Sequence, residues 1–194
     1  LALGNNQSDS VGTVTLANSG SITGTGTSTL TSTGSFEMQS GSASAILGGG
    51  VALNKTTSGT VTLSGANTYT GVTSINSGVL SVATIGNGGV AGNLGAATNA
   101  AANLVLGGGT LQYTGATAST DRNFTLTSGT TNTFDITANN LTISGASTAT
   151  SGALTKIGSG TLTLSGTNLY TGTTTVNAGT LAYGASNVLS TGAV

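Results

Sequence analysis

The chain has 194 residues, of which 33 Gly, 40 Thr, 24 Ser and 17 Asn make up 114, and its seven charged side chains leave a net charge of −1. His, Cys, Pro and Trp are absent. Their absence excludes an imidazole base, a thiol nucleophile, a disulfide framework and a soft metal site. The three dispersed cations, Lys55, Arg122 and Lys156, cannot neutralise a run of phosphates, so we expect no nucleic-acid partner. No apolar stretch is long enough for a membrane span.

Short segments in which polar and apolar residues alternate follow one another along the chain. This period of two is typical of half-buried strands, and Gly, Ser and Asn, which favour turns, separate nearly all of them. In chain order, strands are expected at Val14–Leu16, Phe36–Met38, Thr60–Leu63, Leu104–Leu106, Leu111–Tyr113, Phe124–Leu126, Phe134–Ile136, Leu141–Ile143, Thr161–Leu164 and Leu181–Tyr183. The Ala-containing stretch Ala96–Leu104 is expected to be loop or strand with one short helical turn.

Strands this short and this frequent favour a β-solenoid over a sandwich, whose strands are longer. One coil cannot bury its own apolar residues, but stacked coils bury a continuous column. The predicted fold class is therefore all-β, a β-solenoid (β-helix) with short strands and Gly/Asn/Ser-rich turns, as a single segment over residues 1–194. With roughly 20 to 25 residues in a coil, about eight or nine coils would stack.

The chain contains an internal duplication. Residues 53–80 align with residues 154–181 at a constant offset of 101, without a gap, and with 17 identities in 28 positions. Low complexity does not explain the distinctive matched residues, which are Lys55 with Lys156, Asn67 with Asn168, Tyr69 with Tyr170 and Asn76 with Asn177. In both copies the alternation predicts one buried face. Its residues are Val61, Leu63, Leu162 and Leu164.

Residues 59–78 (GTVTLSGANTYTGVTSINSG) and 160–179 (GTLTLSGTNLYTGTTTVNAG), each preceded by a Lys, resemble the passenger-associated transport repeat of bacterial autotransporters. The resemblance implies a right-handed parallel β-helix that is displayed on, or released from, the surface of a Gram-negative-type cell. In that family the repeat is associated with passenger folding and transport rather than with catalysis. The expected location is therefore extracellular or the bacterial outer surface. No protease or lipase motif of the family is present, so no enzymatic activity is expected.

The carboxylates offer one candidate catalytic pair. A glycoside hydrolase needs two carboxylates facing each other across a sugar, and Asp121 and Asp135 are candidates if adjacent coils bring them together. The competing interpretation has Asp135 pointing outward from its strand and Asp121 in a local ion pair with Arg122. The Gly runs lack the Asp of calcium-binding solenoid repeats and the Lys of a phosphate loop, so no metal or cofactor is expected.

Several uncharged side chains are candidates for binding. Tyr69 and Tyr170 are candidate glycan contacts through ring stacking, or else they cover the edge of the core at a coil corner. The four repeat asparagines either contact a glycan or form a hydrogen-bonded ladder, which we favour; they are Asn67, Asn76, Asn168 and Asn177. Six threonines at alternate positions between Thr23 and Thr33 would form an ice-binding array if that segment is extended, but the run is single.

These observations predict a structural protein rather than an enzyme. It is expected to be a secreted or surface-displayed module that serves as a stalk or filament building block, through coil stacking and end-to-end self-association. A glycan-binding adhesin passenger that contacts a cell-surface glycan is the alternative, followed by a polysaccharide-cleaving β-helix enzyme and an ice-binding solenoid. Because the chain starts at Leu1 within an apolar alternation and stops at Val194 without a polar terminating segment, we also expect a piece of a longer chain or array.

Overall fold

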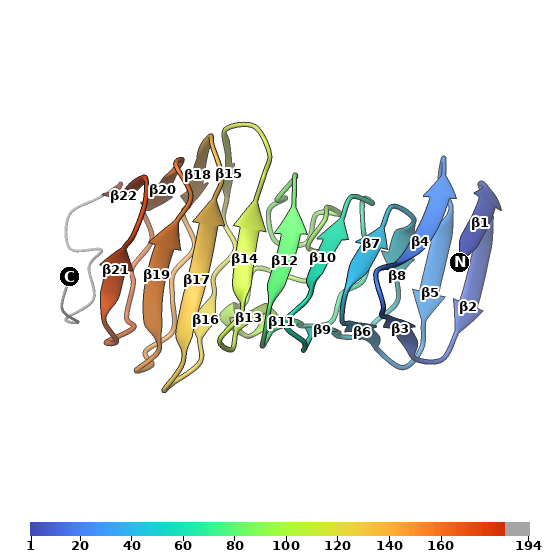
Figure 1. The fold of residues 1–194 in the computed structure, drawn as a ribbon, viewed down its shortest axis with the longest axis horizontal. Helices are drawn as coiled ribbons and strands as arrows, with labels where there is room; N and C mark the ends of the chain where they lie inside the picture. Colours follow the sequence, from blue (N-terminus) through green and yellow to red (C-terminus); the bar gives the residue numbers. More distant parts are fainter. Residues whose placement is uncertain (185–194) are drawn as a thin grey trace.

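The computed structural model describes residues 1–184, which form a rod of stacked coils (Figure 1). Residues 185–194, which the sequence assigns to the same segment, lie outside the described residues. Every pair of named strands is parallel. The expected all-β parallel solenoid of about nine coils is confirmed, while its right-handedness stays a prediction.

Each coil has three faces, which the chain visits in the order face 1, face 2, face 3. Face 1 is a nine-stranded sheet with one strand from each coil. Its strands are β1 (Ala2–Asn5), β4 (Gly20–Thr25), β7 (Gly41–Ala43), β10 (Thr60–Leu63), β12 (Val79–Val82), β14 (Thr110–Tyr113), β17 (Thr131–Ile136), β19 (Ala153–Ile157) and β21 (Thr174–Val176).

Face 2 consists of a three-stranded and a four-stranded sheet. The strands are β2 (Ser8–Val11), β5 (Thr29–Ser32) and β8 (Ile46–Gly48), then β15 (Ala118–Thr120), β18 (Asn140–Ile143), β20 (Thr161–Leu164) and β22 (Thr180–Tyr183). Irregular segments link the two sheets: Thr68 N donates to Leu47 O at 2.9 Å, and Ala96 N donates to Tyr69 O at 2.8 Å. Thr120 Oγ1 of β15 in turn donates to Gly86 O at 3.0 Å. Face 2 is thus continuous in hydrogen bonding although its strands are interrupted.

Face 3 is a six-stranded sheet that covers the first six coils. Its strands are β3 (Val14–Leu16), β6 (Phe36–Met38), β9 (Leu53–Lys55), β11 (Thr73–Ile75), β13 (Leu104–Leu106) and β16 (Thr125–Leu126), and a short 3-10 helix, η1 (Ala101–Asn103), precedes β13. Isolated parallel bridges continue this face from Phe124 to Ser147 and on to Asn168. The strands expected from the alternation and the short turn within Ala96–Leu104 are confirmed.

The core is a set of inward-pointing columns that run along the rod. On face 1, the register pairs Val61 with Leu80, Leu80 with Leu111, and Leu111 with Phe134. All four side chains are at most 1% exposed. The predicted buried positions Val61, Leu63, Leu162 and Leu164 are confirmed, each at 0% exposure. Burial depends on the neighbouring coil, since each side chain is covered from above and below.

The two copies of the repeat lie on different faces of the solenoid. The first copy begins on face 3 with β9 and continues on face 1 with β10, whereas the second begins on face 1 with β19 and continues on face 2 with β20. Coil length explains the change of phase: paired residues on face 1 are 19 apart from Val61 to Leu80 but 31 apart from Leu80 to Leu111. An offset of 101 is therefore not a whole number of coils.

The long coil carries an extra segment, residues 83–99, which we call the excursion. It occupies face 2 of the fifth coil between β12 and η1. Within it, Gly89 N donates to Ala97 O at 2.8 Å and Gly95 N donates to Gly92 O at 3.0 Å. The excursion is the main departure from regular stacking in the described part of the chain.

The face 1 column gives the first testable prediction. Phe134 is fully buried and packs edge-to-face on Phe124, with ring centroids 5.6 Å apart. Phe134→Ala should lower the free energy of unfolding by about 3 to 5 kcal/mol, because it opens a cavity in the column. Thr133→Ala, on the outward side of the same strand, should change it by less than about 0.5 kcal/mol. Denaturant titration measures both, and equal effects would contradict the column.

Candidate functional site

The most distinctive residues of the repeat are two buried lysines at the corners of the coils. Lys55 and Lys156 are each 0% exposed, and each stands in a column of the core, Lys55 next to Met38 and Lys156 next to Phe134. Each side chain therefore points into the solenoid. This role was not predicted from the sequence, although both lysines are in phase with the inward Leu53 and Leu154 of the same strands.

The lysine ammonium groups bind main-chain carbonyls of two successive coils. Lys156 Nζ donates to the carbonyl oxygens of Ile157 at 2.6 Å, Gly158 at 2.8 Å and Ala178 at 3.2 Å. Lys55 Nζ makes the equivalent contacts with Thr57 O and, at 3.0 Å, with Ser77 O. Each lysine thus ties a corner to the same corner one coil further along.

Burial determines the electrostatics of these corners. It lowers the pKa of Lys55 and of Lys156 below the ordinary value, because a buried ammonium loses its hydration. The carboxylate of Asp135 acts in the opposite direction on Lys156. The carbonyl oxygens replace water as acceptors, so the corner lysines serve as structural cross-links.

The two repeat tyrosines are core residues. Tyr69 and Tyr170 are 0% exposed, and their hydroxyls form hydrogen bonds with Thr73 Oγ1 at 2.8 Å and with Thr174 Oγ1 at 2.9 Å. The glycan contact predicted for Tyr69 and Tyr170 is wrong, because neither ring is accessible for stacking. The alternative, in which the ring covers the core at a coil corner, agrees with the burial, and Tyr69 also packs on Phe36 with centroids 6.1 Å apart.

Asn67 links neighbouring coils through main-chain groups rather than through stacked amides. Asn67 Oδ1 accepts a hydrogen bond from Leu47 N at 2.9 Å, and its Nδ2 donates to Asn93 O at 2.9 Å, so one buried side chain spans three coils. Asn168 is also buried, and its Nδ2 donates to Gly166 O at 2.9 Å. Burial removes Asn67 and Asn168 from any glycan surface. The other two positions, Asn76 and Asn177, are exposed.

Arg122 is the third buried cation, and it fastens the excursion. Its side chain is 2% exposed, with Nε donating to Gly86 O at 2.9 Å and one terminal nitrogen donating to Gly95 O at 2.6 Å. Longer contacts of 3.4 Å reach Asn87 O and Ala97 O. Burial lowers the pKa of Arg122, whereas Tyr69 and Asp121 raise it. The guanidinium of Arg122 thus binds four main-chain carbonyls of the excursion from the following coil.

The candidate catalytic carboxylates lie apart in the fold. Asp121 follows β15 at the end of face 2, where its Oδ1 accepts a hydrogen bond from Gly88 N at 2.7 Å. Asp135 points outward from β17 on face 1 and accepts from Gln112 Nε2 at 2.8 Å. The structure therefore does not form the facing pair that a glycoside hydrolase needs. Separate sets of hydrogen bonds on Asp121 and Arg122 replace the expected local ion pair.

Two further expectations concern surface arrays and metals. The threonine run is not one extended segment, because Gly26, with φ of 64°, turns the chain between β4 on face 1 and β5 on face 2. Its hydroxyls are split between two faces, so the predicted ice-binding array is wrong. Over residues 1–184, no three His, Cys, Asp or Glu side chains gather as a metal site. Over the same residues, no helix has the length and apolarity to cross a bilayer.

The corner lysines give a second testable prediction. Lys156→Met keeps the volume of the side chain but leaves its carbonyl partners without a buried donor, which should cost about 1 to 3 kcal/mol of unfolding free energy. Lys55→Met, in the other copy, should act in the same direction for the same reason. Chemical denaturation is the measurement. Variants as stable as the parent chain, or more stable, would show that the ammonium groups are not cross-links.

Tyr69 gives a third, pH-dependent prediction. Burial raises its pKa from 10.0 to about 12, with Thr73 and Arg122 acting in the opposite direction. Because the folded pKa lies above the unfolded one, the stabilisation is present below pH 10 and is lost as the pH rises towards about 12, by about 2 to 3 kcal/mol. Tyr69→Phe should show a shallower loss across this window. Identical slopes for both chains in pH-dependent denaturation would refute the assignment.

Parts of this chain are similar to known bacterial surface proteins. Residues 53–82 and 154–182 match the passenger-associated-transport-repeat family. The chain is 48% identical over 106 residues to the adhesin BmaC autotransporter of Brucella suis biovar 1 (strain 1330). The aligned segment is 54% of this chain but only 3% of that protein. No solved structure matches significantly. The chain is a β-solenoid that carries autotransporter passenger repeats, and the predicted resemblance and extracellular or outer-surface location are confirmed.

Proposed function

We propose that this chain is a stalk section of a surface adhesin: a non-catalytic solenoid that spaces other parts of a passenger from the cell. The observation that carries the proposal is the unbroken core. Buried residues from Leu3 to Tyr170 form one hydrophobic cluster along the described rod. Nine coils at about 4.8 Å each give a rod about 40 Å long that resists bending, because each coil is hydrogen-bonded to the next along its length.

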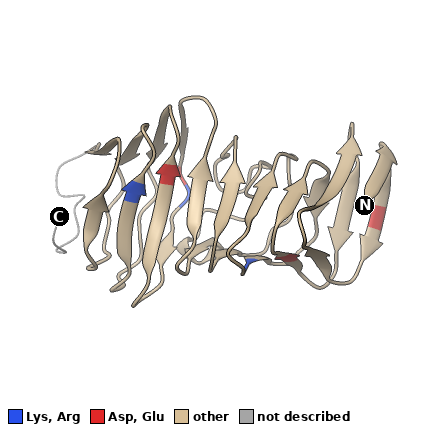
Figure 2. Cartoon of the chain, in the orientation of Figure 1, with Lys and Arg blue, Asp and Glu red and all other residues tan. Residues whose placement is uncertain are grey.

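The outer surface supports a spacing role. The charged residues are scattered along the rod (Figure 2), and the three cations among them are buried. Among the described residues, the exposed large apolar side chains are all aliphatic, and they are Leu1, Val11, Val90, Leu169 and Val176. A glycan-binding role would therefore depend on polar side chains such as Asn76 and Asn177. The relative that is named an adhesin supports adhesion as the role of the larger protein to which such a section belongs.

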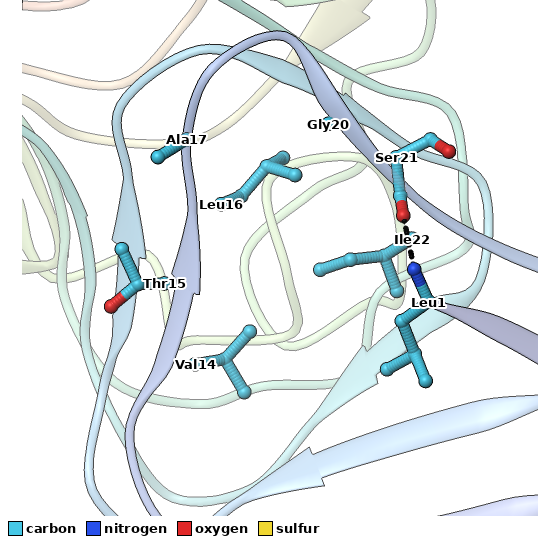
Figure 3. Close-up of a pocket in the computed structure, with 8 residues that line it drawn as sticks. All are labelled: Leu1, Val14, Thr15, Leu16, Ala17, Gly20, Ser21 and Ile22. Atoms are coloured by element: carbon cyan, nitrogen blue, oxygen red, sulfur yellow. Dashed lines mark hydrogen bonds between the residues drawn. The ribbon is translucent and has the colours of Figure 1, made fainter.

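The first described coil offers strand edges on which another coil could stack. Strands β1, β2 and β3 each lie at the end of their sheet, so one side of each has no partner strand among the described residues. Between β3, β4 and Leu1 is a hollow (Figure 3). Apolar and polar groups both line it, with Leu1, Val14, Leu16, Ala17 and Ile22 alongside Thr15, Gly20 and Ser21. Unpaired edges pair readily with another strand. A further coil stacked in parallel, from the same polypeptide or from a second copy, would pair these edges and fill the hollow.

Electron microscopy of the purified chain, undiluted and diluted, tests this fourth prediction. We expect rods that join end to end as the concentration rises. Leu1→Glu should weaken the joining, because it places a charge at the 66% exposed Leu1 beside the hollow. Val90→Glu is the matched control, at a 54% exposed residue of the excursion. Rods that stay separate at all concentrations would refute self-association, and binding to a glycan array would then favour the adhesin alternative.

A further inference from the structure

One dipeptide of the excursion is held in an unusual arrangement with Asp121. Asn87 is the only Asn in the sequence that is followed by Gly, and its side chain is exposed. Gly88 N donates to Asp121 Oδ1 at 2.7 Å, and Asp121 N donates to Asn87 Oδ1 at 3.1 Å. Because the second donor is a main-chain N–H, the amide oxygen of Asn87 must face it. Two hydrogen bonds thus join Asp121 to both Asn87 and Gly88.

These contacts are the ones that a cyclisation of Asn87 would use. In such a reaction the main-chain nitrogen of the following residue attacks the side-chain Cγ of the Asn. The Asp121 carboxylate accepts the hydrogen bond of the proton that the Gly88 nitrogen must lose, which is the position of a general base. The Asp121 N–H donates a hydrogen bond to Asn87 Oδ1, the oxygen at which negative charge develops, as a donor in an oxyanion hole does. Gly88 has no side chain to hinder the attack, and an added Cβ would lie 2.3 Å from Asn99 N.

We propose that Asn87–Gly88 is a self-modification site, at which Asp121 promotes the loss of the side-chain amide of Asn87. The Gly88 N–Asn87 Cγ bond forms while the proton on Gly88 N passes to Asp121. The Cγ–Nδ2 bond then breaks, Asp121 returns the proton, and ammonia leaves a five-membered cyclic imide. Water opens this ring at either carbonyl, which gives Asp or isoaspartate at position 87. One water is consumed and one ammonia is released, without an oxidant or reductant.

The product would weaken the attachment of the excursion. A new carboxylate at position 87 stands beside the Asp121 carboxylate, and like charges at this distance repel. The isoaspartate form also lengthens the main chain by one carbon, within the turn that Val90 N closes on Asn87 O at 3.1 Å. The inward columns do not include this turn, so the excursion should loosen while the coil stack persists. The protein is located outside the cell, where this irreversible change would accumulate slowly with the age of the molecule.

Peptide mapping of the folded chain during incubation at neutral pH tests the proposal. We expect the mass gain and isoaspartate at residue 87, together with released ammonia, well before any change at the exposed Asn76, which precedes Ser and serves as the internal control. Asp121→Asn keeps an oxygen that accepts from Gly88 N but removes the base. Asp121→Asn should slow the loss of the Asn87 amide by at least about tenfold, because it removes a general base.

Two controls keep the outcome decisive. Circular dichroism and limited proteolysis establish that the Asp121→Asn chain is folded, and the urea-unfolded parent chain gives the rate without Asp121 in place. Asn87→Asp, which mimics one product, should be cleaved faster within residues 83–99 while the remaining coils stay protected. A folded chain that reacts no faster than the unfolded one, or an Asp121→Asn variant that reacts faster than the parent, would show that these hydrogen bonds protect Asn87 and would overturn the proposal.

Discussion

Parallel stacking in register is the constraint on which the rest of this structure depends. Each inward side chain is buried only because the next coil places another inward side chain against it, as Leu80 and Leu111 do on face 1. With few large apolar residues, the chain cannot build a thick core, so it makes a narrow one continuous along the rod. Corner glycines follow from the same constraint: Gly78 and Gly179, at equivalent positions of the two copies, have φ of 65° and 66°. An added Cβ on either would lie 2.3 Å from a carbonyl oxygen of the preceding coil.

The two repeat copies show that the duplicated unit is somewhat more than one coil. Within the first copy β9 pairs with β11 and β10 with β12, and within the second β19 pairs with β21 and β20 with β22. The same Lys, Tyr and Gly make the same contacts although the first copy starts on face 3 and the second on face 1. Such a unit can function on any face, because its hydrogen bonds reach only the adjacent coils. The face on which the second copy begins is determined by the summed lengths of the coils between the two copies, including the coil that carries the excursion. This locality suits a module whose proposed role is to extend a stalk.

Much of the fold could be predicted from the sequence, because alternation is a local property. Val61 and Leu63 were predicted to be buried from four residues of sequence, and they are. The face of each strand could not be predicted, since it depends on coil lengths accumulated over many residues. Polar residues of the site were harder still. Lys55 and Lys156 were treated only as dispersed cations, although their phase in the strand places them inward. Arg122 binds carbonyls 25 to 36 residues earlier in the chain, a contact that no local pattern reveals.

The central claim is that the coils stack along the rod with their strands running across it. X-ray diffraction from a shear-aligned, concentrated solution of the chain tests this most directly. Strands that lie across the rod and bond along it predict a reflection near 4.8 Å parallel to the rod axis. The same spacing perpendicular to the axis would mean that the strands run lengthwise, as in a sandwich, and would contradict the stacked-coil account.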